Sequence, residues 1–389
     1  ARKNYRVVVA VQGSWINGTG PNQLSINARG GEAGSFIQVS VQPTPSTVLN
    51  GPDSAGFEAA EAGLGMPYGV AVDQQTHQAY IADRFHDSVV QFDLNAMSID
   101  GGIPGVDGDS AAGDGGTTGV RMNAKLNQVV ALSEGVEQGL RGSIGVIDLD
   151  QLSLKVIPLI YAGQLVHSDF IAVDPNNNVA AFAALYAGGK SAYFVDLNTG
   201  KLTRVDQSLD LTAPAVNPAT DQFIFTAQDA SGIPSLAVYS ASAPFRQVGK
   251  ISSGAPAGTM FDKVAVDPVK NIALAVNQQD STVSVFDLKG GVELARIPFS
   301  PGGAGYGTSD VAINPFTSMA VITSAFTNRV TVVNLKTLLV TSEIPLPAGS
   351  RPLGVDIDTG LNRAVVTENG LSSNTRNGSV FVVQLPAQP

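Results

Sequence analysis

The stretch GVAVDQQTHQAYIADRFHDSVVQFDL, from Gly69 to Leu94, predicts three short β-strands joined by turns. Apolar residues alternate with small or polar residues in each strand, which is the period of two that half-buried strands require. Asp73 ends the first strand, and Asp83 and the pair His86-Asp87 lie around the second gap. Asp side chains stabilise such turns by accepting hydrogen bonds from nearby backbone.

The same pattern returns six more times along the chain. An Asp or Asn, often followed by Pro, marks the end of the first strand of each unit, and these marks recur every 43 to 51 residues: Asp73, Asn123, Asp174, Asn217, Asp267, Asn314 and Asp358. A second mark, such as VDL at Asp196, ends the third strand of most units, and a more polar strand follows it. A period of this length with about four strands per unit is typical of β-propellers. We therefore predict an all-β fold, a seven-bladed β-propeller with an N-terminal β-rich extension.

The start of the chain lies outside this repeat. We expect residues 1–50 to form the β-rich extension, residues 51–68 a linker with one short helical turn, and residues 69–389 the propeller. The seventh unit ends just after its third strand, and an unpaired sheet edge promotes aggregation, so another segment must complete that blade. Tyr5–Gly13 and Ser35–Pro43 are the candidates, and we favour Ser35–Pro43 because it is nearer in sequence to the first blade.

The composition excludes several classes of function. The net charge of −10 argues against a nucleic-acid partner, since phosphate binding needs clustered Lys and Arg. No apolar run reaches the roughly 18 residues of a membrane-spanning helix, and the absence of cysteine excludes disulfides and thiolate sites. Only 14% of the residues are charged, which is common in β-rich extracellular proteins. The chain starts with Ala, so we expect a trimmed, exported protein that is secreted, periplasmic or on a bacterial cell surface.

Two units carry a family resemblance. The unit AVDPVKNIALAVNQQDSTVSVFDL, from Ala265 to Leu288, resembles the repeats of bacterial YVTN-type (YncE-like) surface propellers, and YIADRFHDSVVQFD, from Tyr80 to Asp93, is similar to NHL repeats. The resemblance covers about residues 69–386 and implies the propeller fold. It implies no single activity, because related propellers include binding proteins, lactonases, quinoprotein-like enzymes and surface antigens.

The segment that follows the third strand of the first unit is rich in Asp and Gly. We expect it to replace the outer strand of that unit, and its four carboxylates are candidate Ca²⁺ ligands: Asp100, Asp107, Asp109 and Asp114. Alternating carboxylates in a flexible loop provide the hard oxygen donors that Ca²⁺ prefers. The segment lacks the terminal Glu of an EF-hand loop, so a solvated acidic loop is the favoured interpretation.

The residues just before each first strand should surround one mouth of the central channel. They are Tyr68, Thr118, Asp169, Thr212, Asp262, Asp310 and Leu353. Three of them are carboxylates, Asp169, Asp262 and Asp310, and His167 lies beside the first of these. This set could bind a cation or a polyol, although Asp side chains that cap backbone donors are the favoured interpretation. His77 and His86 lie in turns of the first unit.

The sequence shows neither an HExxH metal motif nor a spacing that indicates a catalytic triad. We therefore expect a non-catalytic module for binding or assembly, whose partner is a second copy of itself, another surface protein or a glycan. The residues expected to mediate assembly lie in the extension: Tyr5, Val7, Val9, Val11 and Trp15. The alternatives are a lactonase-like hydrolase and a Ca²⁺-stabilised adhesin that use the channel mouth, and no cofactor other than Ca²⁺ is expected.

Overall fold

The computed structural model describes residues 22–26, 37–41, 57–104, 116–134, 142–162, 164–165, 168, 170–186, 189–205, 209–277, 279–299, 310–347, 349–368 and 378–386. The chain divides into two compact units, Ala1–Ser46 and Thr47–Pro389. In the first unit, β1 (Asn22–Ile26) pairs with β2 (Ile37–Val41) in an antiparallel ladder. None of the described residues belongs to a helix that could cross a membrane.

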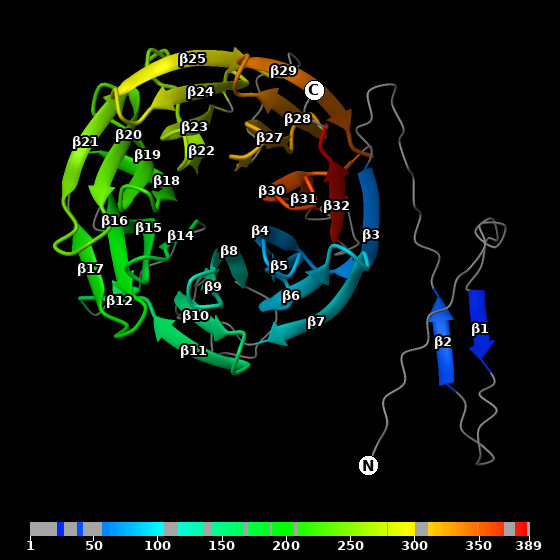
Figure 1. The fold of residues 1–389 in the computed structure, drawn as a ribbon. Coiled ribbons are helices and arrows are strands. Elements are labelled where there is room, and N and C mark those ends of the chain that lie inside the picture. Colours follow the sequence, from blue (N-terminus) through cyan, green and yellow to red (C-terminus); the bar gives the residue numbers. More distant parts are fainter. Residues whose placement is uncertain are drawn as a thin grey trace. The chain divides into compact units, whose positions relative to one another are not determined.

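The second unit is a ring of seven four-stranded antiparallel sheets (Figure 1). Blade 1 consists of β4 (Pro67–Asp73), β5 (Gln78–Asp83), β6 (Ser88–Asp93) and β7 (Ser98–Pro104). Blade 2 consists of β8 (Thr117–Asn123), β9 (Gln128–Ser133), β10 (Ser143–Asp148) and β11 (Ser153–Pro158). Blade 3 consists of β14 (Ala172–Asp174), β15 (Val179–Tyr186), β16 (Gly189–Asp196) and β17 (Leu202–Val205). Blades 4 and 5 consist of β18 (Asp210–Asn217), β19 (Gln222–Gln228), β20 (Pro234–Ser240) and β21 (Gln247–Ser252); and β22 (Phe261–Asp267), β23 (Ile272–Asn277), β24 (Thr282–Asp287) and β25 (Val292–Pro298). Blades 6 and 7 consist of β26 (Val311–Asn314), β27 (Met319–Ser324), β28 (Arg329–Asn334) and β29 (Leu339–Pro345); and β30 (Pro352–Asp358), β31 (Arg363–Glu368), β32 (Gly378–Gln384) and β3 (Phe57–Leu64). A short hairpin of β12 (Ile160–Tyr161) and β13 (Gln164–Leu165) lies between blades 2 and 3.

The prediction of a seven-bladed all-β propeller is confirmed. Each Asp or Asn that marks a unit is the last residue of an inner strand, as Asp73 and Asn123 illustrate. At six of the seven marks, all except Asn123, the side chain accepts backbone N–H groups of the following turn; Asp73 Oδ1, for example, accepts the N–H of Gln75 at 2.9 Å. The described apolar residues gather in clusters between neighbouring blades, with one cluster at each of the seven interfaces. The core is therefore a ring of similar interfaces rather than a single centre.

The expected closing strand is wrong. The outer strand of blade 7 is β3, which pairs with β32 so that Phe57 lies opposite Val383, whereas Ile37–Val41 within the favoured segment pairs with β1. The helical turn expected around Ala55–Gly65 is also wrong, because Phe57–Leu64 is a strand. Ala, Glu and Gly dominate FEAAEAGL and are all poor strand formers, so the local composition gave no indication that β32 would pair with this segment.

The acidic segment after the first unit does not replace the outer strand of blade 1. That strand is β7, which contains Asp100. It pairs with β6, with Ser98 opposite Asp93 at one end and Pro104 opposite Ser88 at the other. Its sequence, SIDGGIP, has two glycines and one proline, and both residue types are depleted in strands. The other three candidate calcium ligands, Asp107, Asp109 and Asp114, lie outside the described residues.

Candidate functional site

Five of the seven inner strands carry a β-bulge near their first residues. The register shifts lie between Pro67 and Val70, Thr117 and Gly119, Leu211 and Pro214, Phe261 and Lys263, and Pro352 and Val355. Five of the positions expected to precede the strands lie inside these bulges instead: Tyr68, Thr118, Thr212, Asp262 and Leu353. Bulges bend a strand and redirect its side chains, and they are common beside binding sites.

Buried threonines stabilise the irregular backbone at this end of the ring. The hydroxyl groups of Thr226, Thr323 and Thr367, all on second strands, accept N–H groups of the neighbouring inner strand or its entry at 2.8–2.9 Å. All three side chains are fully buried, so these bonds satisfy backbone donors in the bulged parts of β18 and β30 and at the entry of β26. Gly69 is required for the same packing, because a Cβ atom there would lie 2.8 Å from the carbonyl oxygen of Thr118.

The bulged ends of the inner strands form a narrow neck with a cavity of about 20 Å³. Its lining includes Tyr68, Thr118, Phe170, Lys263 and Asp310, which come from five different blades. Lys263 Nζ lies 3.3 Å from the centroid of the Phe170 ring, a cation–π contact between blades 5 and 3. The neck therefore has room for about one water molecule.

A larger chamber of about 270 Å³ follows along the channel and is lined by all seven inner strands. Its lining residues are of apolar types except for Arg121 on β8 and Asp356 on β30, although the lining exposes more polar than apolar surface. Arg121 lines the neck as well as the chamber, so its side chain lies where the two spaces meet. The site is thus a chamber whose charged lining residues are one arginine and one aspartate.

The sequence missed Arg121 and Asp356, although a signal was present. The residue two positions before each mark is Ala in five units: Ala71, Ala172, Ala215, Ala265 and Ala312. Arg121 and Asp356 occupy the same position in the other two units. Except for Ala71, all of these residues line the chamber, so the small alanines leave it open and the two charged residues decide its chemistry.

The two carboxyl groups near the channel hold backbone donors of the next blade. Asp310 Oδ2 accepts the N–H of Val355 at 3.2 Å, and Asp356 Oδ2 accepts the N–H of Val72 at 2.8 Å. Their other oxygens accept the N–H of the residue that follows each Asp, at 2.9 and 2.8 Å. Capping of backbone donors, the interpretation favoured from the sequence, therefore describes Asp310.

The protein environment raises the pKa of Asp356 from 3.8 to about 6. Burial is the main cause, and the negative charge of Asp310 acts in the same direction. The N–H groups of Val72 and Ile357 and the charge of Arg121 act in the opposite direction but do not compensate. Asp356 thus carries a proton below about pH 6, which leaves Arg121 as the only charge in the chamber.

Arg121 has unused hydrogen-bonding capacity. Within the described part of the chain, its side chain makes a single hydrogen bond, from Nη1 to the carbonyl oxygen of Val120 at 2.8 Å, and no ion pair. A guanidinium group has five N–H donors in a planar fork. Among the described residues, no acceptor takes up most of these donors.

The remaining candidate residues at the mouth are not all brought together. Asp310 lines the neck, whereas Asp262 lies in the bulge of β22 and is not part of the lining. His167 and Asp169 lie outside the described residues, as do Tyr5, Val7, Val9, Val11 and Trp15 of the expected assembly set. Among the described residues, no three His, Cys, Asp or Glu side chains form a group that could hold a metal ion.

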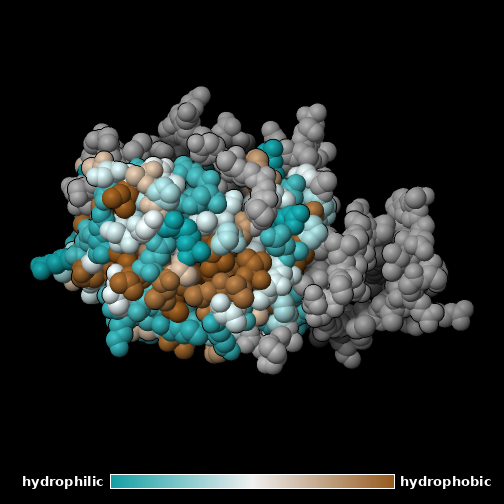
Figure 2. Space-filling model, turned by 90° about the horizontal axis from the view of Figure 1, so that it is seen from above, coloured by the Kyte–Doolittle hydropathy of each residue, from teal (hydrophilic) through white to brown (hydrophobic). Residues whose placement is uncertain are grey.

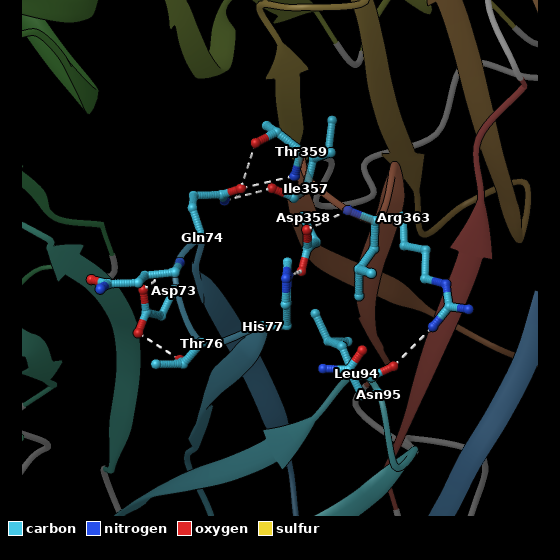
Figure 3. Close-up of polar contacts among 12 residues, drawn as sticks. Asp73, Gln74, Thr76, His77, Leu94, Asn95, Ile357, Asp358, Thr359 and Arg363 are labelled. Atoms are coloured by element: carbon cyan, nitrogen blue, oxygen red, sulfur yellow. Dashed lines mark hydrogen bonds and ion pairs between the residues drawn. The ribbon is translucent and has the colours of Figure 1, made fainter.

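The two described histidines belong to the framework of the ring. His77 Nδ1 contacts Asp358 Oδ2 at 2.6 Å and links blade 1 to blade 7, as Figure 3 shows. At the same junction, Gln74 bonds Ile357 and Thr359, and Arg363 donates to the carbonyl oxygen of Leu94 (Figure 3). His86 Nδ1 lies 2.7 Å from Asp83 Oδ2 within blade 1.

The comparisons with known proteins identify the fold. No family model matches the sequence, and no curated protein matches it. A crystal structure of RRP9 WD40 repeats is similar, with a TM-score of 0.64, 10% sequence identity and coverage of 85% of this chain and 97% of that chain. The structure of U3-55K is similar to the same degree, with a TM-score of 0.63, 10% identity and coverage of 85% and 98%. At this identity the likeness shows a seven-bladed propeller with WD40-like neighbours, and the YVTN and NHL resemblance stays a prediction.

Proposed function

We propose that this chain is a non-catalytic binding module and that its ligand occupies the chamber in the centre of the ring. The observation that carries the proposal is the chamber itself, a space of about 270 Å³ with Arg121 and Asp356 as its only charged lining residues. Small-molecule sites are typically concave and apolar with a few polar groups that orient the ligand. The β-propeller fold is commonly used for binding, which is consistent with this role.

A fragment screen by NMR tests the proposal. The probes are a few hundred small neutral, anionic and cationic compounds, added to the full-length protein and to the variant Ala265→Leu, which fills part of the chamber. We expect some fragments to shift resonances of the inner strands in the wild type and to lose affinity in the variant. The matched control is Ala219→Leu, at an exposed turn position of blade 4. Equal binding to the wild type and to Ala265→Leu would contradict the proposal.

We further propose that the protein is exported and associates with copies of itself through its N-terminal unit. The seven sheets take all their strands from Phe57–Gln384, so none of them requires the unit Ala1–Ser46. Figure 2 views the edge of the ring that carries β25 and β29 and shows apolar side chains gathered there. The exposed apolar residues of these two outer strands are Val292, Leu294 and Leu339. An exposed outer strand with apolar side chains can accept an additional strand from another molecule.

Deletion of residues 1–46 tests the self-association. We expect the ring to remain folded with an unchanged melting temperature, because its strands are all retained. Light scattering after size-exclusion chromatography should show a smaller assembly than that of the full chain. An unchanged assembly size would refute the role of the N-terminal unit, whatever the fragment screen shows for the chamber.

We also propose that the acidic segment after the third strand of blade 1 binds Ca²⁺. Its one described member, Asp100, lies on the outer strand and accepts a weak hydrogen bond from Gln78 Nε2 at 3.4 Å. If calcium stabilises the segment, chelation should lower the melting temperature and added Ca²⁺ should restore it.

A further inference from the structure

The chamber has an asymmetric charge arrangement. Asp356 has both carboxyl oxygens engaged by backbone N–H groups of Val72 and Ile357. Arg121 makes one bond to a backbone oxygen and no ion pair among the described residues. The acidic group is therefore part of the scaffold, whereas the basic group still has donors to offer.

The donor set of Arg121 fits one kind of ligand atom best. A planar guanidinium group presents parallel N–H donors that match the two oxygens of a carboxylate. In an apolar environment such a charge-assisted pair is stronger than in water. Arg121 is the only residue with a positive charge in the chamber lining, so no other lining side chain competes for an anion.

The size of the chamber limits the rest of the ligand. A volume of about 270 Å³ corresponds to about nine water molecules at their share of the liquid volume. A ligand of roughly ten non-hydrogen atoms therefore fits. The lining exposes more polar than apolar surface, so the ligand can carry polar groups beside its carboxylate.

We infer that the chamber binds a small organic monocarboxylate, whose carboxylate pairs with the guanidinium group of Arg121. This inference rests on the proposed function of the chamber as a ligand site and specifies its ligand class. The narrow neck, where Lys263 lies over Phe170, restricts passage at that end of the channel to very small molecules. Occupation of the chamber from that side would require these two side chains to separate.

Asp356 couples this binding to protons. The groups that act on its carboxyl are Arg121 from β8, Asp310 from the entry of β26 and the backbone N–H groups of Val72 and Ile357. When Asp356 loses its proton, a second negative charge stands in the chamber beside the bound carboxylate. Like charges in a shared site repel, so affinity for a carboxylate should fall as the pH rises through the pKa of Asp356.

Isothermal titration calorimetry with octanoate, which has ten non-hydrogen atoms, tests the inference on the full chain. We expect octanoate to bind at pH 5.5, to bind more weakly at pH 7.5, and to lose at least tenfold in affinity in Arg121→Gln. Arg121→Lys should recover only part of the loss, because an ammonium group lacks the planar fork. Arg246→Gln, at an exposed position outside the channel, is the matched control and should bind as the wild type does.

An uncharged probe and a positively charged probe distinguish failure of the carboxylate inference from failure of the chamber as a ligand site. Octan-1-ol and octylamine should bind at least tenfold more weakly than octanoate, and this comparison needs no variant to fold. If octan-1-ol binds as well as octanoate and Ala265→Leu removes both, the chamber is a ligand site but the carboxylate inference is overturned. If Arg121→Gln, with a wild-type melting temperature, binds octanoate undiminished, the inference is overturned as well. If none of the three probes binds at either pH, the inference is overturned, and the fragment screen alone decides the proposed function.

Discussion

The fourth residue after each inner strand adopts a positive φ angle in all seven blades. These residues are His77, Asn127, Asn178, Asp221, Asn271, Ser318 and Asn362, with φ between 49° and 58°. Asn, Asp and His tolerate this left-handed conformation better than most residues. Several of them also bond the mark residue of the preceding blade, as Asn178 does with Asn123 at 2.9 Å and Asn271 with Asn217 at 2.6 Å. His77 and Asp358 are the equivalent pair between blades 7 and 1.

Replacement of His77 tests this equivalence. We expect His77→Asn to change the free energy of unfolding by less than about 1 kcal/mol, because Asn fits the conformation and can bond Asp358. We expect His77→Val to lower it by about 2 to 4 kcal/mol, because valine is strained at a positive φ and leaves a buried carboxylate without this partner. Urea denaturation measures both, and similar losses in the two variants would contradict the assigned role.

Asp83 holds the connection between the closing strand and the first blade. Its carboxyl oxygens accept the N–H groups of Gly65 at 2.9 Å and Met66 at 2.8 Å, and its side chain is 1% exposed. Burial alone would raise the pKa of Asp83, but these donors and His86 outweigh it, so the pKa is lowered. The stabilisation is therefore complete above the ordinary pKa near 3.8 and is lost as the pH falls through the lower value of the folded state.

We expect Asp83→Asn to lower the free energy of unfolding by about 1 to 3 kcal/mol at pH 7. Below about pH 4 the carboxyl group of Asp83 becomes protonated in the unfolded wild-type chain. The difference in the free energy of unfolding between variant and wild type should therefore shrink in this range. Thermal unfolding at several pH values measures this. A difference that stays constant down to pH 2.5 would argue against a contribution from the carboxylate charge.

The contribution of Asp356 to stability should depend on pH in the opposite direction to that of Asp83. Because its pKa is raised from 3.8 to about 6, the folded protein binds more protons than the unfolded chain between these values. Its contribution to stability therefore grows as the pH falls from about 6 to about 4. In Asp356→Asn this increase should be absent, and a variant whose stability changes with pH as the wild type does would contradict the raised pKa.

At the scale of elements, the sequence predicted the inner and middle strands because their pattern is local. The marks, the alternation and the turns of each unit all lie within about 25 residues, so each repeat confirms the others. β3 and β7 were missed because their ladders are decided by a partner strand and their own residues favour other structures. Four of the seven expected mouth positions, Tyr68, Thr118, Asp310 and Leu353, line the neck. Five of the seven lie in bulges and not in entry loops, since a bulge is a feature of pairing that single residues do not reveal. Arg121 and Asp356 stood at repeat positions, and only the ring brought them into one chamber.

The closing strand supports a further prediction about deletions. Removal of residues 1–46 leaves β3 intact, whereas removal of residues 1–64 exposes the edge of β32 and uncovers part of the cluster that contains Leu64. We expect the shorter chain to unfold at least about 10 °C below the other and to aggregate on heating. Differential scanning calorimetry compares the two, and equal melting temperatures would show that β3 contributes little to the ring.

For the whole molecule, the uniform interfaces explain why the architecture could be predicted without knowledge of any ligand. Each blade packs its two faces against its two neighbours, so the same alternation of apolar and polar residues recurs in all seven units. The interface between blades 7 and 1 is sealed by contacts between distant segments, such as Val72 with Asp356, which are 284 residues apart in sequence. The chemistry of the site, in contrast, depends on the two blades whose inner strands depart from the shared pattern.

The position of β3 and β32 at opposite ends of the ring sequence also sets an order of events during synthesis. At about 5–20 residues per second, β3 leaves the ribosome at least about 15 seconds before its partner strand is translated. Throughout this interval six blades can assemble on the nascent chain while β3 has no strand to pair with. A β32 from a neighbouring polysome-bound chain is then a competing partner. We therefore expect exchange of closing strands between nascent copies to be the misassembly that this topology favours.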